Sequence, residues 1–117
     1  MFESDFKRDF SFHKRFEESA KVINQYPDRR PIICEKAFEN VSPTIDKKKY
    51  LVPCDLNVGQ FMYVIRKRLK LLPEEAIFLF VNNRIISGTS IIGTIYDNYK
   101  DADGFLYIQY AKENVYG

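Results

Sequence analysis

The stretch Phe105-Leu106-Tyr107-Ile108-Gln109-Tyr110 is a strand-like run, and the predicted fold depends on it. Asp103-Gly104 precedes it as a turn, and a short polar segment, residues 111–116, follows it. A strand here would anchor a tail that projects into water. That tail ends at Gly117, whose carboxylate can enter a tight channel because glycine has no Cβ. A final glycine alone is common, so other residues have to decide what this tail does.

The composition indicates one globular domain. The 117 residues are 45% hydrophobic and 29% charged, as in an ordinary chain that buries a single core. No apolar run approaches the ~20 residues of a membrane-spanning helix, and the first residues do not resemble a signal peptide. Cys34 and Cys54 fit no metal or redox spacing. We therefore expect two free thiols in a reducing compartment and no cofactor.

The net charge of +2 conceals an uneven distribution. Residues 26–72 carry ten Lys/Arg against five Asp/Glu, whereas residues 73–117 carry three against six. A basic middle favours an acidic partner, although it is also compatible with an ordinary solvated surface.

Apolar spacing predicts the helices. Residues 11–25 form a helix with Ser11 as a possible N-cap, and its apolar residues share one face: Phe12, Phe16, Ala20 and Ile23. A shorter helix is expected before it. Asn57 and Gln60 have capping-box spacing at the start of another helix, which continues to residue 72, before a proline.

Strands are expected over residues 31–36, 49–52, 77–81 and 105–110. The run 77–81 is apolar throughout, which is typical of an interior strand covered on both faces. A further short helix is expected over residues 92–99.

This order of elements describes an α+β fold, a ubiquitin-like β-grasp with a four-stranded mixed sheet preceded by two N-terminal helices. We expect a helical extension packed on the core at residues 1–25. The ubiquitin-like domain would occupy residues 26–112, and residues 113–117 would form a flexible tail.

Several sequence blocks occur in the order of one known family: Tyr26-Pro27-Asp28-Arg29, residues 46–53, Val58-Gly59-Gln60-Phe61, Arg66-Lys67-Arg68, Phe80-Val81-Asn82-Asn83, residues 104–108 and residues 113–117. On these blocks the chain resembles the autophagy ubiquitin-like modifiers, which include GABARAP and the microtubule-associated protein light chain 3 proteins. The match runs from about Phe12 to Gly117, nearly the whole chain.

The resemblance implies a protein that is a substrate and not itself an enzyme. Activating and conjugating enzymes would each hold it as a thioester and join Gly117 to phosphatidylethanolamine. A cysteine protease would process or deconjugate it. The protein would lie in the cytoplasm and, when lipidated, on autophagosome and related membranes, where it would help to form autophagosomes.

The resemblance also implies a site for aromatic-x-x-aliphatic peptides of cargo receptors and autophagy adaptors, built along an edge strand at residues 49–52. The residues expected to hold the aromatic ring, here called the aromatic pocket, are Glu18, Val22, Pro31, Ile33, Lys49, Leu51 and Phe105. Those expected to hold the aliphatic residue, here called the aliphatic pocket, are Tyr26, Val52, Pro53, Leu56, Phe61, Val64 and Ile65. Tyr50 of the same strand is also expected to take part in peptide binding. Three cations would attract acidic residues that flank the peptide: Arg29, Lys47 and Arg68.

Simpler interpretations compete with several of these roles. By composition alone, Phe61 and Ile65 are core residues, and the cluster 47–49 is a solvated loop end. Phe105 follows a glycine at a strand start, so we expect it to be exposed. His13 has no metal-binding or catalytic neighbours in the sequence and is interpreted as a surface residue.

Other function classes are weaker. An unconjugated ubiquitin-like adaptor in trafficking or cytoskeletal interactions would keep the peptide site and lose the lipid. Nucleic-acid binding through the basic middle has no recognition motif to support it, so no nucleic-acid partner is expected. Catalysis would need a nucleophile with a base, a metal cluster or a phosphate loop, none of which the sequence offers.

Overall fold

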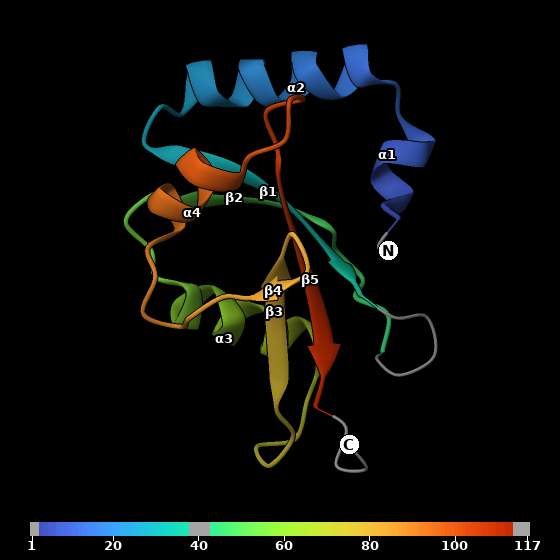
Figure 1. The fold of residues 1–117 in the computed structure, drawn as a ribbon, viewed down its shortest axis with the longest axis vertical. Coiled ribbons are helices and arrows are strands. Elements are labelled where there is room, and N and C mark those ends of the chain that lie inside the picture. Colours follow the sequence, from blue (N-terminus) through green and yellow to red (C-terminus); the bar gives the residue numbers. More distant parts are fainter. Residues whose placement is uncertain (1–2, 38–42, 114–117) are drawn as a thin grey trace.

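A computed structural model describes residues 3–37 and 43–113. Within them, a sheet with the strand order β2-β1-β5-β3-β4 runs through the molecule (Figure 1). Its strands are β1 (Arg29–Lys36), β2 (Lys49–Pro53), β3 (Ile77–Val81), β4 (Arg84–Ile85) and β5 (Leu106–Lys112). The helices are α1 (Asp5–Asp9), α2 (Phe12–Gln25), α3 (Val58–Leu69) and α4 (Ile92–Tyr99).

The sheet is mixed because β1 and β5 run parallel at its centre, with Ile32 opposite Leu106. The other pairs, β1–β2, β3–β5 and β3–β4, are antiparallel. The ubiquitin-like β-grasp prediction is therefore confirmed. The expected four strands are one too few: Asn82 and Asn83, with φ of 51° and 63°, turn the chain into the two-residue strand β4. A strand that short carries no alternation that a sequence pattern could reveal.

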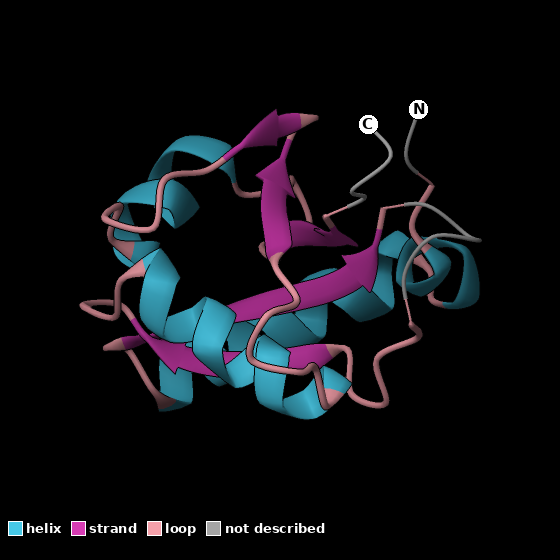
Figure 2. Ribbon diagram, turned by 90° about the horizontal axis from the view of Figure 1, so that it is seen from below, coloured by secondary structure: helices cyan, strands magenta, loops and turns pink. Residues whose placement is uncertain are grey.

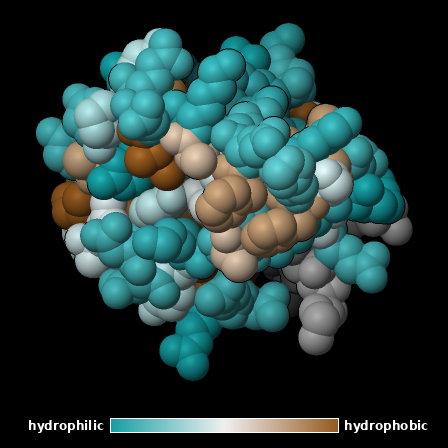
Figure 3. Space-filling view, turned by 90° about the horizontal axis from the view of Figure 1, so that it is seen from above, coloured by the Kyte–Doolittle hydropathy of each residue, from teal (hydrophilic) through white to brown (hydrophobic). Residues whose placement is uncertain are grey.

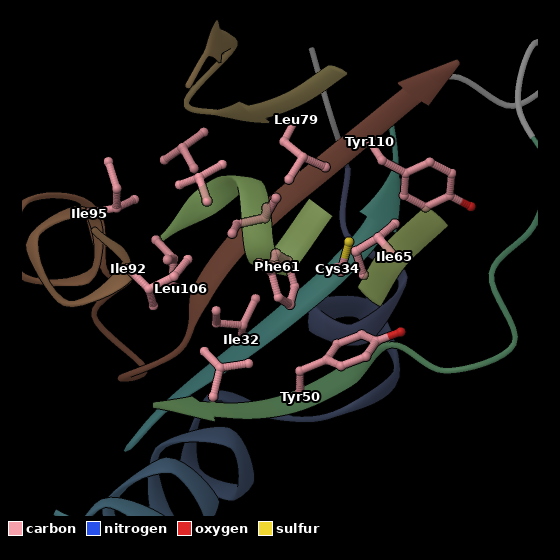
Figure 4. Close-up of a cluster of buried hydrophobic side chains, with 14 of the residues drawn as sticks. Ile32, Cys34, Tyr50, Phe61, Ile65, Leu79, Ile92, Ile95, Leu106 and Tyr110 are labelled. Atoms are coloured by element: carbon pink, nitrogen blue, oxygen red, sulfur yellow. The ribbon is translucent and has the colours of Figure 1, made fainter. Parts of the chain in front are cut away.

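The two faces of the sheet carry different layers, because successive strand residues point to opposite sides. Ile32 and Leu106 join the main core beneath α3, with Phe61 at its centre (Figure 4). Ile33 points to the other face, where it packs with Phe6 of α1. The sheet is thus enclosed by α1 and α2 on one side and by α3 on the other (Figures 1 and 2).

Helix α3 begins as predicted and ends earlier. Asn57 Oδ1 accepts from the Gln60 backbone N–H at 2.8 Å, and Gln60 Oε1 accepts from the Asn57 N–H at 2.9 Å, which completes the capping box. Lys70 adopts a left-handed conformation with φ of 56°, so the helix stops at Leu69. Leu72 therefore lies outside the helix and is 57% exposed.

The expectation that β3 is covered on both faces is wrong, and part of the apolar face of α2 is exposed. Phe12 and Phe16 of α2 stack on each other and are 50% and 49% exposed, whereas Ile23 of the same predicted face packs against the main core. Figure 3 views the molecule from this end, where apolar side chains gather among hydrophilic ones. Strand β3 is covered on one face only, because Phe78 is exposed and Phe80 is half-buried.

Polar contacts with Asp103 hold α2 to the sheet. The buried carboxylate accepts hydrogen bonds from Arg15 Nη1 at 2.6 Å, from the Tyr107 hydroxyl at 2.5 Å and from the Phe105 N–H at 2.9 Å. Ser19 Oγ donates to the Asp103 carbonyl at 2.5 Å. Burial and the hydrogen bond to Asp103 raise the pKa of Tyr107, which keeps its hydroxyl protonated as a donor.

We predict that Arg15→Met lowers the free energy of unfolding by about 3 kcal/mol, because it leaves a buried carboxylate without its cation. Urea denaturation measures the change. Arg8→Met is the matched control, because Arg8 pairs with Asp5 on the exposed surface and its loss should cost no more than ~1 kcal/mol. Equal losses in the two variants would contradict the anchoring role of Arg15.

Candidate functional site: an open strand edge between two pockets

Strand β2 lies at the edge of the sheet and, among the described residues, pairs with β1 alone. This confirms the predicted edge position of residues 49–52. The Cys34 N–H donates to the Lys48 carbonyl at 2.8 Å, and the Cys54 N–H donates to the Asp28 carbonyl at 2.9 Å. These two bonds fix the alternation of the antiparallel ladder.

The same alternation shows which backbone groups of β2 are available to a partner. Tyr50 and Val52, opposite Ile32 and Arg30, direct their N–H and C=O groups toward β1. Those of Lys49 and Leu51 point outward. Arg29 Nη1 reaches the Leu51 carbonyl only at 3.5 Å, too long for a strong hydrogen bond. An extended peptide could therefore bond to β2 as a further strand.

The structure gathers most of the aromatic pocket on the α2 face of the sheet. Register pairs place Pro31 opposite Leu51 and Ile33 opposite Lys49. Both residues of β1 are buried, and Leu51 is half-buried. Lys49 Nζ lies 3.1 Å from each carboxylate oxygen of Glu18 on α2, so an ion pair spans this face. Val22, one turn further along α2, is half-buried.

The prediction that the Phe105 side chain is exposed is wrong. Its side chain is 2% exposed, because the ring of Phe6 covers it edge-on at a centroid distance of 5.2 Å. Phe6 belongs to α1 and was not among the predicted site residues. The only sequence signal for it is an isolated apolar residue within the polar run Asp5-Phe6-Lys7-Arg8-Asp9. Phe105 can thus contribute to the site only as a covered wall.

The aliphatic pocket lies on the opposite face, against α3. Val52, Phe61 and Ile65 are buried in the main core, so they can form the floor of this pocket. Leu56 and Pro53 are half-buried, with Leu56 packed against the same core, and Tyr26 and Val64 are exposed. The core interpretation of Phe61 and Ile65 is therefore confirmed, and their part in binding stays a prediction.

The predicted cations are exposed near β2. Arg68 Nε lies 3.3 Å from Asp46 Oδ1, and Lys47 Nζ lies over the Tyr50 ring, 5.0 Å from its centroid. Arg29 is exposed where β1 begins. Burial raises the pKa of Tyr50 to about 12, so its hydroxyl stays neutral and donates to the Lys47 carbonyl at 2.8 Å. The strand edge therefore presents positive charge without a nearby ionised tyrosine.

The end of β5 is fastened to the segment before β3. Lys112 pairs with Ile77 in the sheet, and the Glu113 N–H donates to the Ala76 carbonyl at 2.8 Å. Lys112 Nζ also bonds to Glu75, which lowers the pKa of that carboxyl. Gly117 and most of the predicted tail, residues 114–117, lie outside the described residues.

Two kinds of feature are absent from the described residues. No group of three or more His, Cys, Asp or Glu residues suited to a metal ion occurs within residues 3–37 and 43–113. Over the same part of the chain, no helix has both the length and the apolar content needed to cross a membrane.

Fold and edge together define a ubiquitin-like β-grasp protein with an open outer strand. A family model described as "Autophagy protein Atg8 ubiquitin like" matches residues 14–117. The chain therefore belongs to the Atg8 family, the autophagy ubiquitin-like modifiers that the sequence blocks resemble.

Individual relatives agree with this assignment. Autophagy-related protein 8 of Mycosarcoma maydis is 55% identical over 114 residues, which cover 97% of each chain. The crystal structure of Trypanosoma brucei ATG8 matches with a TM-score of 0.92 and 43% identity, covering 98% of this chain and 99% of that one. Plasmodium falciparum Atg8 in complex with a P. falciparum Atg3 peptide matches with a TM-score of 0.85 and 34% identity, covering 93% and 96%.

Proposed function

We propose that this chain is a modifier that becomes joined through Gly117 to phosphatidylethanolamine and then recruits cargo receptors and adaptors through aromatic-x-x-aliphatic peptides. It is a substrate of activating, conjugating and processing enzymes and not itself an enzyme. Its places of action are the cytoplasm and, once lipidated, autophagosome membranes. The observation that carries the proposal is the open outer edge of β2, with apolar clusters on both faces of the sheet beside it.

The placement of the two pockets matches the spacing of such a peptide. In an extended strand, residues i and i+3 point to opposite faces, because side chains alternate with a period of two. Ile33 and Lys49 lie on the α2 face of the sheet, whereas Val52 belongs to the core on the α3 face. A peptide added beside β2 would thus direct its aromatic residue to one pocket and its aliphatic residue to the other.

The charges around β2 and the similarity to a peptide-bound structure support the same site. Arg29, Lys47 and Arg68 are exposed around β2 and would attract acidic residues next to the peptide core. The Plasmodium neighbour was solved with a peptide of Atg3, which supports peptide binding as a property of this fold in this family.

We predict that a peptide with one tryptophan at its aromatic position binds in the micromolar range, since a contact this small gives about −7 to −8 kcal/mol. The chain contains no tryptophan, so the peptide's indole fluorescence reports burial of that ring alone. Its emission should shift to the blue on binding, and raised salt should weaken the complex.

Leu51→Pro tests the added strand directly. It removes an outward N–H, whereas Leu51→Val keeps that N–H and still shortens the side chain. The proline variant should lose roughly fivefold more affinity than the valine variant, since it forfeits a backbone hydrogen bond worth about 1 kcal/mol. Equal losses would show that the peptide does not pair with β2.

We predict that purified activating and conjugating enzymes, with ATP and phosphatidylethanolamine liposomes, attach the chain to the membrane. Flotation followed by gel shift measures the product. Gly117→Ala should abolish it. Gly88→Ala is the control, because a Cβ there meets backbone atoms no closer than 3.8 Å.

Two outcomes would contradict the conjugation. An unchanged yield with Gly117→Ala would refute the role given to the final glycine. A wild-type chain that binds peptide and is never conjugated would instead be an unconjugated ubiquitin-like adaptor.

A further inference from the structure

The inner wall of the aromatic pocket is partly made by the chain's own N-terminus. Phe6 is 5% exposed and packs with Ile33 and Phe105 in a cluster separate from the main core, with Tyr107 against it. Ile33 and Phe105 are also two of the residues predicted to hold a partner's aromatic ring. The ring of Phe6 therefore occupies space beside the surfaces that a bound ring would contact.

Phe6 is held in this position by its backbone and its neighbours. Its N–H donates to Glu35 Oε2 at 3.1 Å, and Ser4 Oγ donates to Glu35 Oε1 at 2.6 Å. Glu35 is itself buried, with Lys48 Nζ 3.7 Å from its carboxylate. The ring of Phe10 lies 5.0 Å from that of Phe6, measured between centroids. The position of Phe6 is thus fixed from several directions.

Lys49 connects Phe6 to the mouth of the pocket. Its Nζ forms the ion pair with Glu18 and also lies over the Phe6 ring, 5.9 Å from the centroid. A peptide ring that enters between α2 and β2 would therefore contact Lys49. The ring of Phe6, which Lys49 overlies, would limit how deep the peptide ring can go.

We propose that Phe6 sets the depth of the aromatic pocket and so determines which aromatic ring the site prefers. This inference rests on the proposed peptide-binding function and assigns it a specificity-determining residue on α1. Removing the Phe6 ring would open space next to Ile33 and Phe105. A large indole could use that space, whereas a phenyl ring reaches less of it.

The test compares two peptides that differ only in tryptophan or phenylalanine at the aromatic position. Isothermal titration gives both dissociation constants for the wild type, Phe6→Ala, Phe6→Leu and Phe16→Ala. We expect Phe6→Ala to shift the preference toward tryptophan by at least ~fivefold, since filling an apolar space by a few carbon atoms gives selectivity of this order. Phe6→Leu, which keeps most of the contact, should restore a ratio near that of the wild type.

Phe16→Ala is the matched control, because it removes an exposed phenylalanine that stacks on Phe12, outside the Phe6 cluster. Its ratio should equal that of the wild type. Thermal unfolding identifies any variant that fails to fold. If Phe6→Ala does, Phe6→Leu and Phe6→Trp decide, and the larger ring at position 6 should favour the phenylalanine peptide.

The other outcomes are distinct. Equal weakening of both peptides would overturn the proposal and leave Phe6 a purely structural residue. Equal strengthening would overturn it as well, because Phe6 would then be a competitor for the pocket. A wild type that binds neither peptide would refute peptide binding itself, whereas an unchanged ratio with intact binding refutes only the role of Phe6.

Discussion

The parallel pairing of β1 with β5 is the constraint on which the remaining structure depends. It places β5 in the middle of the sheet and leaves β1 with one free side, which β2 fills as the outermost strand. It brings the turn before β5 beneath α2, where Asp103 meets Arg15. The other end of β5 lies beside β3, where Lys112 pairs with Ile77, and Glu113 follows it. One pairing therefore positions both the open edge and the start of the tail.

The two faces of the sheet are stabilised differently, and this difference matters for binding. The α3 face is a continuous apolar core, so Val52, Phe61 and Ile65, which are predicted to line the aliphatic pocket, are tightly packed. The opposite face is held by a buried ion pair, by Glu35 and by the small cluster around Phe6. Side chains on this face are held by a few directional contacts, so they can move with a smaller loss of packing than the side chains of the apolar core. We expect selectivity among partners to arise on the α2 face.

Much of the fold was predictable because local patterns and tertiary structure agree. The capping box at Asn57, the runs that became β1, β2 and β3, and the turn before β5 each follow from neighbouring residues. The long-range contacts were not predictable in this way. The pairing of Arg15 with Asp103 joins residues far apart in a chain rich in charges, and the burial of Phe105 depends on one ring from a short polar helix. The exposure of Phe12 and Phe16 was not predictable either, because periodicity identifies a shared helix face and not the side to which that face turns.

The central claim is that β2 keeps an unpaired outer edge that a peptide completes. Amide hydrogen exchange at single-residue resolution tests it most directly. The backbone N–H groups of Lys49 and Leu51 point outward, whereas those of Tyr50 and Val52 donate to β1. In the unbound protein, the amide of Leu51 should exchange at least about a hundredfold faster than that of Val52, and peptide should slow it strongly. A Leu51 amide as protected as that of Val52 before peptide is added, or unaffected afterwards, would contradict an open edge.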